Sequence, residues 1–206
     1  MQNKSFKFIE IGGVIKRFSL FSLALCSALY STDFTYDGKN GNGYLNSENF
    51  TLTSNVTNGN KLTFNYNPDD SGVTNPKQAF VVDVKTDEDV YNNTFTIING
   101  KVTEHVYTAS SEKGKAYNNK LIINGGKLYI AMAGFSNDSD AYDNYVLVTD
   151  GIIEETVYGA NISGVDTNRA YNNTVEVQGG TIKNVVGAAT SAVNTNGGDI
   201  YIIIRF

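Results

Sequence analysis

The sequence predicts an all-β protein that folds as a right-handed parallel β-helix, or β-solenoid, with an N-terminal capping region. Three observations lead to this fold class. A phrase that starts with Tyr recurs four times, at Tyr91, Tyr117, Tyr142 and Tyr171, a spacing of 25 to 29 residues. Apolar residues and a glycine follow each Tyr at equal distances, and no helical periodicity is found after residue 30. Such internal repeats are typical of solenoids, in which each repeat buries its apolar side chains against its neighbours.

Residues 1–28 are predicted to be a signal peptide for export through the Sec machinery. Four basic residues precede an apolar run over 18–25, namely Lys4, Lys7, Lys16 and Arg17. The segment Cys26-Ser27-Ala28 supplies the small residues that a signal-peptide cleavage site requires, so we expect cleavage after Ala28. The apolar run is too short to span a membrane. The alternative is a lipoprotein signal at Cys26, although Leu25 stands before it where a small residue is usual.

Residues 29–89 are predicted to form an N-terminal β cap that leads into the repeats. Three short stretches have the apolar and β-branched composition of strands, at 50–52, 61–66 and 79–84. Turns rich in Asn, Gly and Asp, such as 67–72, separate them. A cap is expected because the open edge of an end strand would otherwise pair with another chain.

Residues 90–201 are predicted to form about four coils, where a coil is one full circuit of the solenoid. Counted from each Tyr, apolar residues stand at +4 (Phe95, Leu121, Val146, Val175), at +6 (Ile97, Ile123, Val148, Val177), at +11 (Val102, Leu128, Ile153, Ile182) and at +15 (Val106, Met132, Val157, Val186). Glycine stands at +9 (Gly100, Gly126, Gly151, Gly180). The alternation at +4 and +6 is that of a half-buried strand, and glycine permits a sharp turn. Each coil is therefore expected to run strand, glycine turn, strand and variable polar loop, aligned without a gap to +15.

The position at +2 from each Tyr is always asparagine. Its four members are Asn93, Asn119, Asn144 and Asn173. In stacked coils these amides are expected to form a ladder that is hydrogen-bonded from coil to coil, with the Tyr rings stacked beside it. The alternative is a plain surface turn without a ladder.

The C-terminal end departs from the repeat pattern. A fifth Tyr, Tyr201, falls near the expected position, but Ile202-Ile203-Ile204 follows it in place of Asn-Asn. We therefore expect 202–206 to be an aberrant tail, produced by a frameshift or by truncation of a longer gene. The alternative is a natural short terminal strand. The DNA downstream, read in all frames, would distinguish the two.

Composition argues against several classes of function. The net charge is −5 and basic residues are scattered, so no nucleic-acid-binding patch is predicted. The single histidine, His105, has no second histidine for a metal site or triad, and no phosphate-binding loop is present. Candidates for a glycosidase-type carboxylate pair are Asp69, Asp70, Asp138, Asp140, Glu154 and Glu155. The first four lie in turn-forming segments, and the last two are adjacent on a strand and should face opposite sides. We therefore predict no catalytic, cofactor or metal site, and no enzyme activity.

The repeat from Ala170-Tyr171-Asn172-Asn173 to Gly179-Gly180-Thr181-Ile182 resembles repeats in the passenger regions of bacterial type V autotransporters. Residues 116–126 show the same pattern, and the resemblance covers roughly residues 90–201. It implies a β-helical passenger, often an adhesin, that is exported through a C-terminal outer-membrane barrel. This chain has no barrel-like segment, so the resemblance implies that the barrel is encoded downstream.

The repeats and the resemblance favour a non-enzymatic, secreted or surface-displayed module whose partner is a host surface, an abiotic surface or a glycan. Two alternatives are a secreted β-helix enzyme acting on polysaccharide and a structural stalk without a ligand. An enzyme would need carboxylates gathered on one face of the stack. The full-length parent is expected at the bacterial cell surface, on the outer membrane, whereas a truncated fragment would stay in the periplasm.

Overall fold

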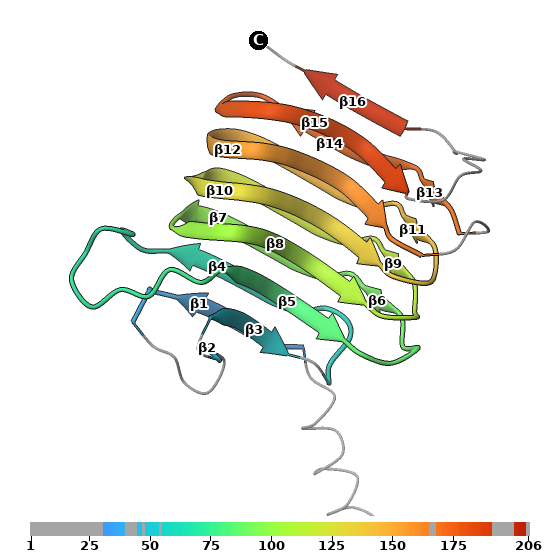
Figure 1. Ribbon diagram of the computed structural model, residues 1–206, viewed down its shortest axis with the longest axis horizontal. Helices are drawn as coiled ribbons and strands as arrows, with labels where there is room; N and C mark the ends of the chain where they lie inside the picture. Colours follow the sequence, from blue (N-terminus) through green and yellow to red (C-terminus); the bar gives the residue numbers. More distant parts are fainter. Residues whose placement is uncertain are drawn as a thin grey trace, which may run out of the picture. The chain divides into compact units, whose positions relative to one another are not determined.

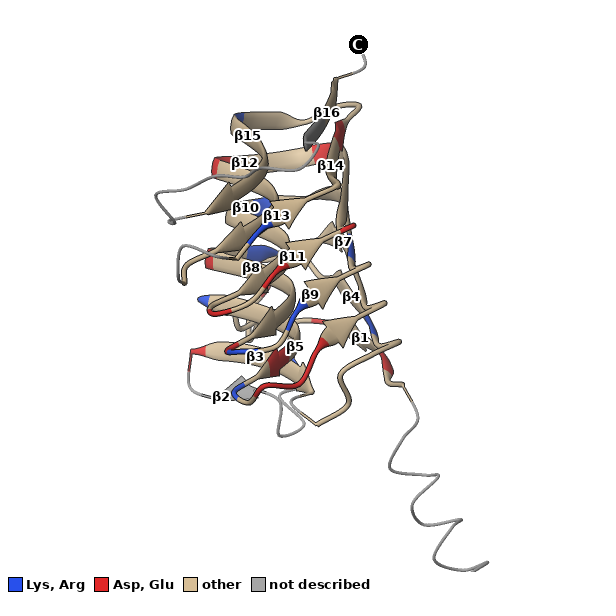
Figure 2. Ribbon diagram, turned by 90° about the vertical axis from the view of Figure 1, so that its right-hand side faces the viewer, with Lys and Arg blue, Asp and Glu red and all other residues tan. Residues whose placement is uncertain are grey.

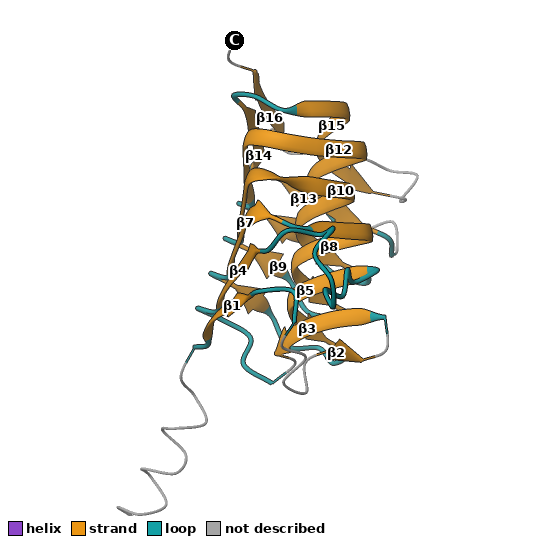
Figure 3. Ribbon diagram, turned by 90° about the vertical axis from the view of Figure 1, so that its left-hand side faces the viewer, coloured by secondary structure: helices purple, strands orange, loops and turns teal. Residues whose placement is uncertain are grey.

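The computed structural model describes residues 31–39, 45–46, 48–53, 55–164, 168–190 and 200–204. The predicted signal peptide, residues 1–28, lies outside these ranges. The described part is a right-handed parallel β-solenoid of about six coils, built from strands and loops without a helix (Figure 1, Figure 3). The predicted fold class is therefore confirmed.

The strands form three faces of the solenoid, and the inner coils contribute to all three. Face 1 holds β1 (Asp33–Tyr36), β4 (Lys61–Asn65), β7 (Thr94–Asn99), β14 (Asn173–Val177) and β16 (Ile200–Ile204), with the first parts of β10 (Lys120–Ser136) and β12 (Tyr145–Ile162). Face 2 holds β2 (Leu45–Asn46), β3 (Asn49–Thr53), β5 (Gln78–Val84), β8 (Lys101–Ser111) and β15 (Thr181–Thr190), with the later parts of β10 and β12. The short face 3 holds β6 (Val90–Tyr91), β9 (Ala116–Tyr117), β11 (Ala141–Tyr142) and β13 (Ala170–Tyr171).

The apolar columns predicted at +4 and +6 stack on face 1 and fill the interior. One column runs Phe34, Leu62, Phe95, Leu121, Val146, Val175 and Ile202, and the other runs Tyr36, Phe64, Ile97, Ile123, Val148, Val177 and Ile204. In the first column, the side chains from Leu62 to Val175 are at most 1% exposed. Parallel strands lie about 4.8 Å apart, so like side chains contact one another from coil to coil and exclude water.

The glycine at +9 makes the corner between face 1 and face 2. All four of these glycines have positive φ, from 85° at Gly126 to 140° at Gly100. A Cβ atom on Gly126 would lie 2.8 Å from the carbonyl oxygen of Gly100 in the coil below. Both the backbone angle and the close approach of the next coil therefore require glycine, as the sequence pattern predicted.

The ungapped alignment to +15 is wrong. The strand register places Val106, Ala131, Val157 and Val185 in one interior column, so Met132 and Val186 belong to the next, outward column. The register shifts between Leu128 and Ile130 because β8 and β12 each contain one more residue than β10 and β15 after the corner. A bulge absorbs this residue, which a fixed spacing cannot anticipate.

The coils extend further toward the N-terminus than the four predicted repeats. Within 29–89, β1 pairs with β4 and β3 pairs with β5, both in parallel register with the later coils. Only β2 differs, because it pairs antiparallel with β3 and so covers its outer edge. The ring of Tyr36 lies 4.8 Å from Phe50 and 4.9 Å from Phe64, which fills the N-terminal coils with aromatic side chains.

The register of the C-terminal strand β16 shows that the predicted alignment of Tyr201 with the Tyr171 column is wrong. This residue pairs with Thr174, three positions beyond the Tyr171 column, and Ile200 stands opposite Asn173. Ile202 and Ile204 therefore continue the two interior columns of face 1.

Candidate functional site: the corner ladder and the outer side of face 2

A ladder of five buried asparagines joins the coils at the corner between face 3 and face 1. In the series Asn60, Asn93, Asn119, Asn144 and Asn173, the Nδ2 of each of the first four donates to the Oδ1 of the asparagine in the next coil, at 2.9 to 3.1 Å. The same oxygen also accepts the backbone N–H of the preceding asparagine. All five side chains are at most 1% exposed, so these bonds satisfy polar groups that water cannot reach. The predicted ladder is confirmed, and the alternative of a plain surface turn is wrong.

The residue before each ladder asparagine has a left-handed backbone. Asn92, Asn118, Asp143 and Asn172 have φ between 52° and 56°, and Gly59 has φ of 72°. Asn, Asp and Gly adopt this conformation at the lowest cost, which explains why no other residue type stands at this position. The segment Asn58-Gly59-Asn60 is therefore a fifth, N-terminal copy of the phrase that lacks the tyrosine.

Four tyrosine rings stack beside the ladder, as predicted. Neighbouring ring centroids in the series Tyr91, Tyr117, Tyr142 and Tyr171 are 4.8 to 5.0 Å apart, with planes within 5° of parallel. Partial desolvation, followed by the neighbouring Tyr171 and Tyr117 and then by nearby carboxylates, raises the pKa of the Tyr142 hydroxyl. Because the ring faces are covered by one another, this stack offers a ligand only ring edges and hydroxyl groups.

Charge alternates along the same corner. The residue two places before each stacked tyrosine is Asp89, Lys115, Asp140 or Arg169, and Figure 2 shows the acidic and basic segments alternating beside β9, β11 and β13. Asp89 Oδ1 accepts the backbone N–H of Lys115 at 2.8 Å, and Asp140 Oδ1 accepts that of Arg169 at 2.8 Å. These groups therefore bind coil to coil and present no uniform charge to a partner.

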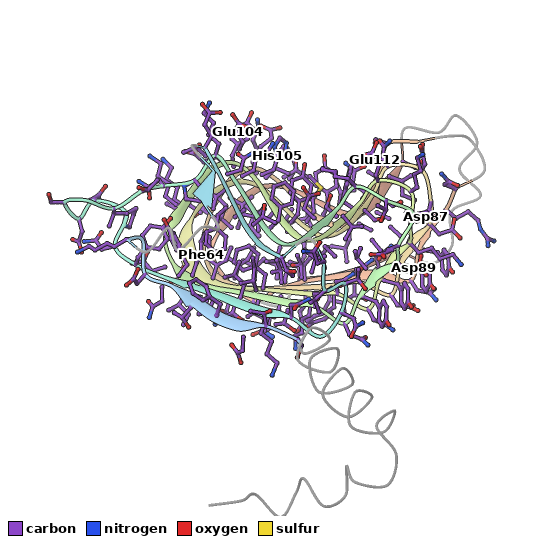
Figure 4. The ribbon with its side chains drawn as sticks, turned by 90° about the horizontal axis from the view of Figure 1, so that it is seen from below. Phe64, Asp87, Asp89, Glu104, His105 and Glu112 are labelled. Atoms are coloured by element: carbon purple, nitrogen blue, oxygen red, sulfur yellow. The ribbon has the colours of Figure 1, made fainter. Side chains whose placement is uncertain are left out.

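Face 2 bends inward along its middle, so its outer side is concave (Figure 4). A Cβ atom on Gly134 would lie 2.5 Å from Asn144 Nδ2, and one on Gly159 would lie 3.0 Å from Asn173 Cβ. The backbone of face 2 thus approaches the asparagine ladder across the interior. The bend is possible because the residues there are small, namely Ala133-Gly134 in β10, Gly159-Ala160 in β12 and Gly187-Ala188 in β15.

Larger side chains flank these small residues on the outer side of face 2. One column runs Phe80, Tyr107, Met132, Tyr158 and Val186, and the second runs Asp83, Ser110, Phe135, Asn161 and Ala189. Tyr107 and Tyr158 point outward because their neighbours Val106 and Val157 belong to the interior core. We call the two columns together the concave face.

The N-terminal half of the concave face is an aromatic cluster separate from the core. Phe80 and Met132 are only 6% and 3% exposed, yet neither packs into the interior. The ring of Tyr107 stacks on Phe80 at 4.7 Å and 5°, and it meets the edge of Phe135 at 5.5 Å. Burial, followed by the charges of Asp83 and Glu104, raises the pKa of Tyr107 to about 12. This tyrosine is therefore a neutral hydrogen-bonding group at every physiological pH.

His105 lies at the rim of the concave face, next to Glu104 (Figure 4). Its ring stacks on Tyr107 at 5.7 Å, and Nδ1 is buried without a hydrogen-bond partner. Desolvation lowers the pKa of His105, although the charge of Glu104 opposes this shift. His105 therefore packs as part of the aromatic cluster.

The candidate carboxylates lie apart in hydrogen-bonded turns and ion pairs. Asp70 accepts from Asn67 Nδ2 at 2.8 Å in an exposed turn that also holds Asp69, while Asp138 and Asp140 lie in the loop before β11. Glu154 and Glu155 both lie on the outer side, where they form ion pairs with Lys127 and Lys183 of the neighbouring coils. The expectation that these two face opposite sides is wrong, because the β12 bulge lies between Ile153 and Thr156. The described residues contain no group of three acidic, histidine or cysteine side chains placed to hold a metal ion.

Sequence reasoning missed the concave face. The signal was present as small-residue pairs that recur 16 to 18 residues after each tyrosine from Tyr117 onward, at 133–134, 159–160 and 187–188. Small residues at fixed places in a stack indicate close approach of another backbone or side chain. Of the outward residues beside them, Met132 and Val186 were placed in the apolar column at +15 because of the one-residue bulge.

Comparison with known proteins identifies no relative of this chain. In the part of the chain that the structure describes, no helix has the length and apolar character to cross a membrane. No family model matches the chain, and neither a curated protein nor a solved structure is similar to it. The fold is therefore assigned from its own strand register and ladder.

Proposed function

We propose that the chain is a non-enzymatic binding module, secreted or displayed at a bacterial cell surface in the manner of an adhesin passenger segment. The observation that carries this proposal is the concave face, where aromatic side chains that the core does not use line up across successive coils. Solenoids bind partners through such extended surfaces rather than through one deep pocket. Tyr107, Phe135 and Tyr158 of this face are half-buried and so remain partly accessible, and accessible apolar patches are typical of interaction sites.

Removal of the predicted signal peptide would leave the start of the solenoid intact. The backbone N–H of Thr32 donates to Asn60 Oδ1 at 2.9 Å, and this is the first coil-to-coil bond of the ladder. Cleavage after Ala28 would leave this bond and all described residues in place. Export in an unfolded state also suits a chain whose single cysteine, Cys26, lies before the cleavage site.

The alternative of a polysaccharide-active enzyme has less support from the site. Hydrolysis of a glycosidic bond needs two carboxylates on opposite sides of the scissile bond. Glu154 and Glu155 are each paired with a lysine, and the concave columns hold one carboxylate, Asp83, which accepts from Ser110 Oγ at 2.9 Å. The alternative of a ligand-free stalk is distinguished by experiment.

The test is adhesion of beads coated with the exported chain to epithelial cells, glass and polystyrene. We expect adhesion to at least one of these surfaces, and we expect Tyr158→Glu to abolish it by placing a charge on the concave face. Thr96→Glu, which adds the same charge to the outer side of face 1, is the matched control and should retain adhesion. No adhesion to any surface would favour the stalk, and equal loss in both variants would exclude the concave face.

A further inference from the structure

The concave face has the chemistry of a site for an uncharged ligand. Of its ten column members only Asp83 is charged, and none is basic. A nucleic acid or an acidic polymer would require cations there to replace its counterions. The other members offer aromatic rings, aliphatic groups and the neutral polar groups of Tyr107, Ser110, Tyr158 and Asn161.

The spacing of these groups repeats with the coils. Successive members of each column lie one strand apart, about 4.8 Å along the solenoid axis. Tyr107, Met132 and Tyr158 occupy three successive coils, and Phe135 and Asn161 face two of them across the small residues. A ligand that fits must therefore be extended along the axis and repeat its own chemistry at a similar interval.

We infer that the concave face binds an extended, uncharged polysaccharide, with its sugar rings packed on Tyr107, Phe135 and Tyr158. This inference rests on the proposed binding function. A sugar ring presents an apolar C–H surface that packs on aromatic side chains, and its hydroxyls pair with amide, hydroxyl and carboxylate groups. One ring is about as long as the spacing between coils, so a chain of sugars meets equivalent groups in turn.

An extended peptide fits this face less well. Peptides in extended form usually bind by adding a strand to an open sheet edge, where their backbone groups find partners. The strands of the concave face from β5 to β12 are paired on both sides. A peptide lying across them would leave its own N–H and C=O groups without backbone partners, whereas a polysaccharide has no such requirement.

The test is isothermal titration calorimetry of the full chain with cellohexaose, laminarihexaose and mannohexaose, and with the disaccharide of each. At least one hexaose should bind, and its disaccharide should bind at least about tenfold more weakly, the factor that ~1.4 kcal/mol of lost contact produces. Tyr158→Ala should weaken hexaose binding about three- to tenfold, the range of one aromatic contact. Tyr158→Phe keeps the ring and should stay close to the wild type.

Tyr145→Ala on face 1 is the matched control and should bind as the wild type does. Melting temperatures of all variants show whether a loss of binding reflects unfolding. Binding that Tyr145→Ala abolishes and Tyr158→Ala leaves intact would overturn the inference. If no hexaose binds but the beads still adhere through the concave face, the polysaccharide inference fails while the proposed function stands. If neither occurs, both fail.

Discussion

Asn119 shows what one side chain contributes to this fold. Its Oδ1 accepts the N–H and the Nδ2 of Asn93, and its own Nδ2 donates to Val90 and Asn144. All four bonds lie in a dry interior, where a donor without a partner costs about 1–3 kcal/mol. The ladder is thus stabilised less by the strength of each bond than by the penalty for breaking it.

We predict that Asn119→Ala lowers the free energy of unfolding by about 3 kcal/mol or more, because it leaves buried donors in the coil below without an acceptor. Urea denaturation followed by circular dichroism measures this loss. The matched control is Asn124→Ala, an exposed asparagine whose removal should change stability by less than about 0.5 kcal/mol. Similar losses in both variants would show that the ladder contributes little.

A second prediction concerns the interior columns. Val148→Asp should destabilise the chain by about 4 kcal/mol, because it places an unpaired charge at a fully buried position between Ile123 and Val177. Thr174→Asp, on the outer side of β14, should stay within about 1 kcal/mol of the wild type. Equal denaturation midpoints would contradict the assignment of Val148 to the core.

A third prediction is a pH dependence of stability. The folded state lowers the pKa of His105 below its ordinary value of 6.5, so the unfolded state binds the proton more readily. The stabilising effect of keeping this histidine neutral is complete above pH 6.5 and is lost as the pH falls through the lower, folded-state pKa. His105 is the only histidine. The fall in melting temperature between pH 7.5 and 6 should therefore be smaller in His105→Gln, and an unchanged fall would contradict the shift.

The elements show where sequence reasoning succeeds and where it stops. Alternation at +4 and +6 correctly assigned the strands of face 1, because those positions are buried by the next coil in every repeat. It failed in face 2, where one extra residue in β8 and β12 changes which side chains face inward. Spacing alone cannot reveal a bulge, since the inserted residue is of the same general type as its neighbours in the strand.

The C-terminal element was misaligned as well. Tyr201 looked like the next member of the tyrosine column, but the strand register places it opposite Thr174 and sets Ile202 and Ile204 opposite Val175 and Val177. The concave face was missed because the glycine and alanine residues that allow face 2 to bend have no functional groups that would mark them in the sequence. Their effect is visible only when the backbone position of the ladder is known.

The exposed isoleucines of β16 lead to a prediction about self-association. Ile202 and Ile204 are 46% and 52% exposed, and among the described strands β16 pairs only with β14. Such an apolar edge invites another chain to add a strand. We expect the 206-residue chain to form oligomers or aggregates in size-exclusion chromatography, and we expect Ile204→Lys to increase the monomer fraction. Thr174→Lys is the control, and a monomeric wild type would contradict the prediction.

At the scale of the whole molecule, the described coils share one continuous core, and one asparagine ladder joins five of them. The asparagines of five coils are joined without interruption from Asn60 to Asn173. No described coil could be removed without exposing the apolar columns of its neighbours. The concave face is therefore held in place by the entire stack.

A last prediction concerns the exported form. When the chain is produced in a Gram-negative host, N-terminal sequencing of the exported product should show that it begins at Leu29. The cleaved product should have the circular dichroism spectrum of a β-solenoid, because no described residue is lost. Recovery of only the uncleaved chain, or of a lipid-modified Cys26, would contradict cleavage after Ala28.

The direction of the ladder gives the solenoid two chemically different ends. Every link runs the same way, with donors in the earlier coil and the acceptor oxygen in the later one. Loss of the first coil would strip donors from an oxygen, whereas loss of the last would leave N–H groups without acceptors, which folded proteins tolerate less well. A coil on the C-terminal side therefore supplies the acceptor that the preceding coil lacks, whereas a coil on the N-terminal side supplies donors.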